Sequence, residues 1–554
     1  MSGATALSPI EQQAPWRWVI ACFAAALVLQ LELVFNRPVN WDEFFHLSEA
    51  HAFHQGRLAE TLQVLYARAF FWLPMLPVDA VDQIRIARLF MLGFEMATLA
   101  AIYGIGRHFA GRLPAALATL AYFTGGYVVQ HGFSYRADPM AAAFLMGSLW
   151  MLLESRLDAK AITITALLAA LALLTTIKVV FYAPAFAAVA WLRWREAELP
   201  SDTLRRLGLL AIVTSVLSGL FVGATILSLP EITHSPAASA SKTITTSGMM
   251  MFSEGMFPRW PYILGAITAA PFLAALLLSA PMAISRANLT HSNRVVIAAL
   301  IVPLASIIFY RNSFPYFYVF ILPPVMVGVA VAIGQIIERV SAKLLMTAFM
   351  ANALIISLAT PRTVLPVQKE VLTAVHEIFP EPVAYFDFPG MIVDFPKANF
   401  FMTTWGVRKY WVGHEESFVD VMARETVPLL VLNQELLDRN QTGAEPAWEL
   451  KEEDARALRD GFIPHWGPLW VAGRRFPPFS GIQDFLVYTP GIYTIEGAAA
   501  RIDRKQYMPG DFVQLRRGVY RFEPDTPNET RLRWGKNLKR PAQPFSANPL
   551  FKDF

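Results

Sequence analysis

Residues 16–46 read WRWVIACFAAALVLQLELVFNRPVNWDEFFH. The first twenty positions are apolar apart from a few polar side chains, and about 20 apolar residues are what a helix needs to cross a bilayer. Two carboxylates, Asp42 and Glu43, follow soon after that run ends. The run lacks the small-residue cleavage site of a signal peptide, so we interpret residues 16–35 as a retained membrane span.

Ten further apolar runs follow the first. Backbone groups in lipid must bond within their own segment, so each run predicts a transmembrane helix. The charged fraction, 16% of 554 residues, is well below the roughly 25% of soluble chains. We therefore predict a polytopic α-helical membrane protein with about eleven transmembrane helices in residues 1–360. The runs lie at approximately 16–35, 84–108, 112–131, 137–153, 160–175, 176–194, 207–229, 261–284, 294–310, 316–337 and 341–359.

Basic residues in the connecting loops predict the orientation, because cytoplasmic loops are rich in Lys and Arg. From a cytoplasmic N-terminus, the inside loops carry Arg107, Arg112, Arg156, Lys160, Arg193, Arg195, Arg205, Arg206, Arg286, Arg294, Arg339 and Lys343. An odd number of spans then places the C-terminal region on the periplasmic side of a bacterial inner membrane. The runs 160–175 and 176–194 have almost no loop between them, and a single kinked helix there would reverse that side.

The remainder of the chain is expected to be water-soluble. Residues 361–454 alternate helical and strand patterns, which favours a small α/β region. Residues 455–554 show short alternating strands broken by Pro-Gly turns, which favours a β-rich module such as a sandwich. No G-x-G-x-x-G follows a strand, so a dinucleotide site is not indicated. A net charge of +4 without a basic cluster excludes nucleic acid as a partner.

Charged residues at a membrane boundary cost several kcal/mol unless they are paired or wetted, so they are candidates for function. In the predicted topology two groups of carboxylates and three cations gather at the outer side. They are Asp42 and Glu43 after the first span, Arg136 and Asp138 at the start of the fourth, Lys178 between two apolar runs, and Arg311 before the tenth.

These residue types suit the transfer of a sugar from a lipid phosphate to a hydroxyl group. A carboxylate must accept the hydroxyl proton, and cations must stabilise the departing phosphate. We expect Asp42 to be the base, with Asp138 positioning the acceptor or sharing that role, and Glu43 is a third catalytic candidate. We expect Lys178, Arg136 and Arg311 to hold the donor phosphate. We expect the aromatic rings of Trp41, Tyr316 and Tyr318 to stack on sugars.

The same residues resemble motifs of the GT-C superfamily of membrane glycosyltransferases. Asn40–Glu43 is similar to the acidic motif in the first outer loop of protein O-mannosyltransferases and lipid A aminoarabinose transferases. Arg136–Met140 resembles the second acidic site of the aminoarabinose group, and Lys178 with Pro184 resembles its Lys-then-Pro segment. Arg311, Tyr316, Tyr318, Pro323 and Pro324 resemble a late segment of these families. Two departures stand out: Lys178 lacks the usual following Gly, and residues 312–315 separate Arg311 from its Tyr.

The resemblance covers about residues 1–360 and implies a GT-C glycosyltransferase. It implies a polyprenyl-phosphate-linked sugar donor, a glycan, glycolipid or protein acceptor at the outer membrane face, and inversion at the anomeric carbon. By analogy, the C-terminal β-rich module is expected to bind glycan or acceptor. No cofactor is expected. A divalent metal is possible but not indicated, because His46, His51 and His54 lack a close common spacing and no Cys/His cluster of zinc spacing is present.

Other interpretations remain open. Asp42, Glu43 and Asp138 are also suited to capping helices, and Lys178 and Arg311 to snorkelling toward the interface. A transporter or flippase would line its path with charges deep inside the spans, and Glu32 and Glu95 fall inside predicted spans. A scaffold whose outer region binds a partner would leave the long first loop without a purpose.

Overall fold

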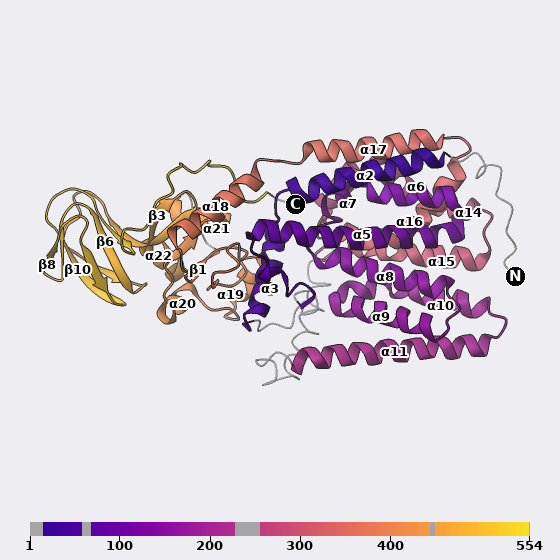
Figure 1. Ribbon diagram of the computed structural model, residues 1–554, viewed down its shortest axis with the longest axis horizontal. Helices are drawn as coiled ribbons and strands as arrows, with labels where there is room; N and C mark the ends of the chain where they lie inside the picture. Colours follow the sequence, from indigo (N-terminus) through magenta and orange to yellow (C-terminus); the bar gives the residue numbers. More distant parts are fainter. Residues whose placement is uncertain (1–14, 58–67, 228–254, 444–448, 553–554) are drawn as a thin grey trace.

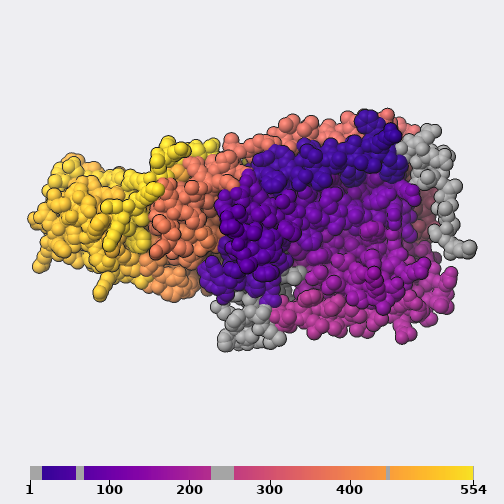
Figure 2. Space-filling model, viewed as in Figure 1, coloured from indigo at the N-terminus to yellow at the C-terminus, as the bar shows by residue number. Residues whose placement is uncertain are grey.

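The computed structural model describes residues 15–57, 68–227, 255–443 and 449–552. The molecule is elongated, with a helical half joined end-on to a C-terminal region (Figure 1). In the space-filling view the C-terminal region forms the narrower end of the molecule (Figure 2). The last described residues return to the junction of the two parts, where the carbonyl of Leu550 accepts a hydrogen bond from Gln368.

Within the described residues, each predicted apolar run is helical over most of its length, and these helices make up the helical half. Its α-helices are α2 (Trp16–Asn36), α3 (Trp41–His54), α5 (Ala80–Ala110), α6 (Arg112–Phe123), α7 (Gly126–His131), α8 (Ala137–Glu154), α9 (Ala159–Thr175), α10 (Ala183–Arg195), α11 (Pro200–Leu227), α13 (Trp260–Ala269), α14 (Pro271–Arg286), α15 (His291–Ile301), α16 (Phe317–Ile336) and α17 (Ala342–Ala359). Short 3-10 helices are η1 (Leu73–Met75), η2 (Ile177–Tyr182) and η4 (Val302–Ile308).

Length and composition allow seven helices among the described residues to cross a membrane, or eight if the bent pair α13–α14 is one span. The exposed apolar surface of helix α11 indicates that the helical half is surrounded by lipid. This helix lies at the edge of the helical half (Figure 1), and its most apolar window has no buried residue. Leu204 and Leu220 are 60% and 65% exposed. Such a surface is stable in hydrocarbon and would aggregate in water. The chain is a multi-pass membrane protein.

The two runs with almost no loop between them form separate antiparallel helices. Helix α9 ends at Thr175, and η2 and α10 return toward the other end of the bundle. Arg193, near the end of α10, donates to the carbonyls of Leu153 at 3.1 Å and Ser155 at 2.6 Å. Both carbonyls lie just before the start of α9, so α10 ends where α9 begins. Residues 160–194 therefore do not form a single kinked helix.

Helix α16 is the centre of the helical half, with 94% of its apolar window buried. It contains Pro323 and Pro324, which lack N–H groups and leave the carbonyls four residues earlier without helical donors. Two buried tyrosines supply the missing bonds. The Tyr122 hydroxyl donates to the carbonyl of Val319 at 2.9 Å, and the Tyr182 hydroxyl donates to that of Phe320 at 2.6 Å.

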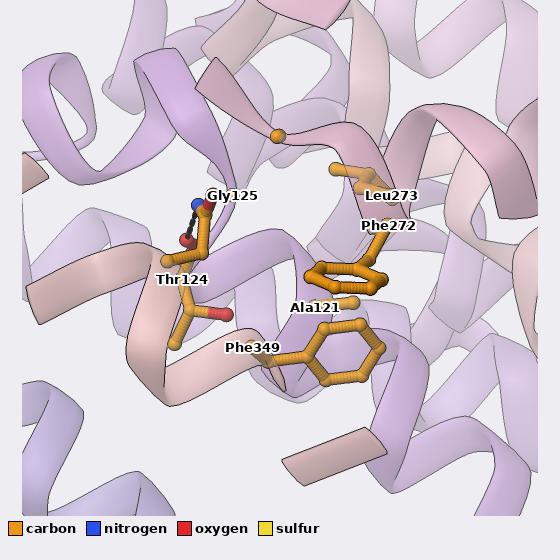
Figure 3. A pocket seen from close by; sticks show the side chains of 8 residues that line it. Ala121, Thr124, Gly125, Phe272, Leu273 and Phe349 are labelled. Carbon is orange, nitrogen blue, oxygen red and sulfur yellow. Dashed lines mark hydrogen bonds between the residues drawn. The ribbon is translucent and has the colours of Figure 1, made fainter. Parts of the chain in front are cut away.

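Two helix breaks meet on one side of the bundle. The turn at Thr124 and Gly125 separates α6 from α7, and α13 and α14 are bent by 105° at Ala270. A small apolar pocket lies between them, and Figure 3 shows the side chains of Phe272 and Phe349 within it. The carbonyl of Thr124 accepts a hydrogen bond from the Asn352 amide at 3.0 Å, which pairs a backbone group that the break exposes.

The C-terminal region begins with α18 (Val364–Ile378) and contains two sheets. One has the strand order β1-β2-β4-β11-β6-β9, with β3 also paired to β4, and the other has the order β5-β10-β7-β8. The other helices are α19 (Thr404–Trp411), α20 (Phe418–Arg424), α21 (Glu435–Thr442) and α22 (Glu452–Gly461). The strands are β1 (Tyr385–Phe386), β2 (Leu429–Val431), β3 (Phe462–Trp466), β4 (Leu469–Phe476), β5 (Gln483–Val487), β6 (Gly491–Gly497), β7 (Ala500–Ile502), β8 (Lys505–Tyr507), β9 (Phe512–Leu515), β10 (Gly518–Pro524) and β11 (Thr530–Trp534).

Apolar side chains from the two sheets pack together at the far end. Phe476 of β4 and Phe522 of β10 stack with ring centres 3.6 Å apart. The larger sheet also crosses the expected boundary at residues 454–455, because β2 pairs with β4. The α/β and β-rich parts therefore share one sheet.

The C-terminal region is bonded to the first outer loop. The buried amide of Gln368 in α18 accepts from the N–H of Val39 at 3.0 Å and donates to its carbonyl at 2.7 Å. The same amide donates to the carbonyl of Leu550 at 2.9 Å, which fixes the returning end of the chain. Since Val39 lies three residues before Asp42, this junction places the C-terminal region over the candidate site.

Candidate active site

Asp42 lies in the first turn of α3, directly after the first span. The Asn40 side chain accepts a hydrogen bond from the backbone N–H of Asp42 at 3.0 Å, and the Glu43 side chain accepts from that of Asn40 at 3.0 Å. This capping box fixes where α3 begins. The Asp42 carboxylate is left pointing away from the cap and accepts a hydrogen bond from Arg136 through Oδ2.

Glu43 is fully engaged in holding the fold. Its Oε1 accepts from Arg88 Nε at 2.8 Å and from the N–H of Tyr135 at 2.9 Å, and its Oε2 accepts from Arg88 Nη2 at 2.5 Å. Burial opposes ionisation, but Arg88 and the backbone donors outweigh it and lower the pKa of Glu43. Both oxygens are occupied, so this geometry joins α3 to α5 and to the loop before α8.

Asp42, Arg136, Asp138 and Lys178 form a continuous chain of alternating charge. Arg136 bonds Asp42 and has its Nε 3.7 Å from Asp138 Oδ2, while the Lys178 ammonium donates to Asp138 Oδ1. All four residues are between 2% and 8% exposed. Charges buried to this degree are stable only when paired, so each member of the chain depends on its neighbours.

Local sequence explains how these four side chains converge. Arg136 is extended at the N-cap of α8, and Asp138 lies in the first turn just before Pro139. Extended Thr176 separates α9 from η2, and its hydroxyl oxygen lies 3.4 Å from the backbone N–H of Lys178. A continuous helix from α9 to α10 would remove this turn, which brings Lys178 to Asp138.

The stretch between η4 and α16 covers the ion-pair chain with an aromatic ring. The Arg136 guanidinium lies over the Tyr316 ring with its Cζ 3.4 Å from the ring centre, and the Lys178 ammonium is 5.8 Å from the same ring. Arg311 is buried in the same stretch, and its guanidinium lies 4.9 Å from the ring centre of Trp405 in α19.

Two predicted sugar-binding residues have other aromatic neighbours. The Tyr318 ring is 5.3 Å from that of Tyr127, and its buried hydroxyl has no hydrogen-bond partner among the described residues. The Trp41 ring lies 5.3 Å from Phe388 and 5.6 Å from Phe401, both in the C-terminal region. Of the predicted sugar contacts, Tyr316 thus touches the ion-pair chain.

Sequence reasoning missed three residues whose partners lie far away along the chain. Arg88 lies in the predicted apolar run 84–108, which also contains Arg85 and Glu95, and a charge inside such a run was a signal for a buried partner. Arg37 is another cation of the first outer loop, and its guanidinium nitrogens lie 3.4 Å from the ring nitrogens of His131. Trp405 lies 94 positions after Arg311 along the chain, and no local pattern links the two.

The histidines of α3 are held by polar neighbours. His51 Nε2 is 2.8 Å from Gln83 Oε1, and His46 Nδ1 is 3.4 Å from Glu49 Oε2. Among the described residues, no group of three or more His, Cys, Asp or Glu side chains is arranged to hold a metal ion.

The five predicted polar residues around Tyr316 carry two carboxylates and three cations. At the end of the helical half that faces the C-terminal region, Arg136 and Lys178 pair with Asp42 and Asp138. Such a site favours an anion, and two of its cations are held ready by carboxylates that remain nearby. It can bind a phosphate and offer a carboxylate to a hydroxyl proton in the same place.

Comparison with known proteins gives similarity at the level of structure. No family model and no curated protein matches the sequence. The crystal structure of ArnT from Cupriavidus metallidurans in the apo state aligns with a TM-score of 0.54 at 12% identity, over 83% of this chain and 98% of that chain. ArnT from the same organism bound to undecaprenyl phosphate gives 0.47 at 15% identity, over 66% and 71%. The archaeal oligosaccharyltransferase AglB from Archaeoglobus fulgidus gives 0.48 at 10% identity, over 82% and 73%.

Proposed function

We propose that this chain, a polytopic membrane protein with a GT-C-type fold, transfers a sugar from a polyprenyl-phosphate donor to a hydroxyl group. The predicted fold class is confirmed by the alignment with apo ArnT, which extends over nearly all of that chain. The observation that carries the proposed activity is the buried chain Asp42–Arg136–Asp138–Lys178 beneath Tyr316.

The two cations of the ion-pair chain, Arg136 and Lys178, suit the phosphate of the donor. Lys178 and Arg136 lie at the membrane end of the site, where the lipid tail of a donor remains in the bilayer. The planar guanidinium fork of Arg136 can bind two phosphate oxygens at once. Asp138 keeps both cations oriented, and Arg311 supplies a third positive charge from the stretch before α16.

Asp42 is suited to accept the proton of the attacking hydroxyl. The hydroxyl oxygen attacks the anomeric carbon, the bond from that carbon to the phosphate oxygen breaks, and the proton passes to the Asp42 carboxylate. The leaving polyprenyl phosphate takes the bonding electrons, and its negative charge is stabilised by Lys178 and Arg136. Attack from the face opposite the phosphate inverts the anomeric carbon, which is the outcome we expect.

We also propose that the site faces the outer side of a bacterial inner membrane. The end of α8 opposite Asp138 is rich in basic residues: Arg107 pairs with Glu154 at 2.9 Å, and Arg206 donates to the carbonyl of Arg156 at 3.0 Å. Cytoplasmic ends carry this excess of Arg, so the site and the C-terminal region would be periplasmic.

The test is release of free polyprenyl phosphate by the purified protein from a panel of polyprenyl-phosphate sugars with bacterial envelope acceptors. Asp42→Asn keeps the size and the cap of α3 but removes the base, and we expect its rate to fall by about 10²–10⁴-fold. Binding of the donor should remain. Asp79→Asn is the control, because it makes the same Asp-to-Asn exchange outside the site, at the N-cap of α5, where Asn caps as well as Asp.

An Asp42→Asn rate equal to the native rate would contradict the assignment of the base. No release from any donor would instead favour the transporter alternative. One observation speaks for that alternative: Glu95 is buried in α5, and neither carboxylate oxygen has a hydrogen-bond partner in the described part of the chain. A transporter would move intact donor across vesicles, and Glu95→Gln would stop that movement.

A further inference from the structure

A group of aromatic rings joins α3 to the C-terminal region beside Asp42. Trp41 and Phe45 lie one turn apart on α3, on either side of Asp42 in the sequence. Phe45 stacks on Phe401 with ring centres 4.1 Å apart and planes within 5°. Phe388 lies 5.6 Å from Phe401 and 5.3 Å from Trp41. All four rings are half-buried, so part of each remains accessible.

The loop that carries Phe388 and Phe401 is held by a buried polar network. The Asp387 carboxylate is fully buried and accepts from the N–H groups of Gly390 and Met391, each at 2.9 Å. The Lys397 ammonium donates to the carbonyls of Asp387, Asn399 and Phe400 at 2.7–3.1 Å. Buried charges in a loop cost free energy unless they are satisfied, and here they fix the positions of the two rings.

Helix α19 begins three residues after Phe401 and carries Trp405. Trp405 is half-buried, and two guanidinium groups lie over its ring, Arg311 at 4.9 Å and Arg408 at 6.0 Å. Figure 1 shows α19 and β1 next to α3 at the junction of the two parts. We call Trp41, Phe45, Phe388, Phe401 and Trp405 the aromatic platform.

We propose that the aromatic platform is the acceptor subsite and that it binds a sugar ring of a saccharide acceptor. This rests on the proposed transferase function and adds the substrate class and the part of the chain that receives it. The C-terminal region would then complete the active site with side chains of its own.

Position argues for the acceptor rather than the donor. The donor phosphate is assigned to Lys178 and Arg136, on one side of Asp42. The platform begins at Trp41 and continues into the C-terminal region, outside the membrane-spanning helices. A ring bound there has its hydroxyls near Asp42, and inversion then requires one of them to attack the anomeric carbon on the face opposite the phosphate.

Chemistry argues for a sugar. Half-buried aromatic rings present apolar faces to the C–H groups of a pyranose, while their edges leave its hydroxyls in water. Arg408 beside Trp405 adds donors for hydroxyl or acidic groups of the saccharide. An isoprenoid chain would remain among the lipid-facing helices instead.

The experiment measures two ligands on the full-length protein in nanodiscs. The first is polyprenyl phosphate, and the second is a set of oligosaccharides released from the envelope of the source organism and labelled at the reducing end. Phe401→Ala and Trp405→Ala should weaken oligosaccharide binding by about tenfold or more, as expected for loss of one stacked ring. Phe401→Ala should bind polyprenyl phosphate as the native protein does, which also shows that it folds.

Two matched controls separate the platform from aromatic surface in general. Phe479 is 85% exposed in the distal β-rich part, and Trp411 is 48% exposed at the end of α19 itself. Phe479→Ala and Trp411→Ala should leave oligosaccharide binding unchanged. Oligosaccharide binding that survives Phe401→Ala and Trp405→Ala would overturn the inference. If the native protein binds polyprenyl phosphate but no oligosaccharide, the subsite is wrong and the transferase proposal stands; if it binds neither, both fall.

Discussion

Two tyrosine hydroxyls replace the helical donors that Pro323 and Pro324 remove from α16, and a double-mutant cycle can test this pairing. Tyr122 donates to the carbonyl of Val319, four residues before Pro323, and Tyr182 donates to that of Phe320, four residues before Pro324. Tyr122 and Tyr182 are both 0% exposed. Tyr→Phe at either position leaves a carbonyl buried without a donor.

The magnitude follows from the cost of an unmade hydrogen bond. A buried acceptor without its partner costs about 1–3 kcal/mol, although hydrogen bonds between membrane helices average only about 0.6 kcal/mol. We expect about 1–2 kcal/mol for Tyr122→Phe, because the carbonyl lies in a tightly packed core with no room for water. Pro323→Ala restores an N–H that reaches the Val319 carbonyl, so in that background Tyr122→Phe should cost less than about 0.5 kcal/mol.

The assay is unfolding in mixed micelles, followed by circular dichroism as the denaturing detergent is increased. Each tyrosine serves as the control for the other. Pro323→Ala should reduce the cost of Tyr122→Phe and leave that of Tyr182→Phe unchanged, and Pro324→Ala should do the reverse. If Tyr122→Phe costs the same in the native and Pro323→Ala backgrounds, the tyrosine does not replace the missing helical donor and the reasoning is refuted.

Four further outcomes are expected. Glu43→Gln should destabilise the protein by about 3–5 kcal/mol because it leaves Arg88 buried without its counter-charge; an unfolding midpoint within error of the native value would contradict this. The folded-state pKa of Glu43 is lowered, so its stabilisation is complete above the unfolded value of about 4.3 and is lost as pH falls through the folded pKa, and thermal melts from pH 7 to pH 3 should show a fall that Glu43→Gln lacks. Lys178→Met should weaken polyprenyl phosphate binding about tenfold or more, measured by titration calorimetry, and unchanged affinity would remove Lys178 from the phosphate site. Lys397→Met should speed amide hydrogen exchange in residues 387–401 while α16 stays protected, and equal exchange in both proteins would show that the ammonium does not hold this loop.

Sequence alone was sufficient for the helical architecture and for the main candidates. A bilayer requires long apolar helices, so the runs were visible in composition, and each proved helical in the described residues. The sequence also singled out Asp42, Arg136, Asp138 and Lys178, because a charge at the membrane boundary is costly unless it is paired or functional. Their assembly into one ion-pair chain agrees with the expectation that they gather at one end.

Tertiary structure decided what each of those charges does, because pairing depends on distances that no local pattern encodes. Glu43 and Asp42 are adjacent in sequence, yet one is occupied by Arg88, 45 positions later, and the other faces Arg136. Trp405 reaches Arg311 because α18 and the returning C-terminus fix the C-terminal region over the first outer loop. The sequence determined by itself which segments form the apolar helices, since that depends on composition, and seven or eight of those described are long and apolar enough to cross a membrane. Which side chains meet at the site was decided by the packing of helices against one another and against the C-terminal region.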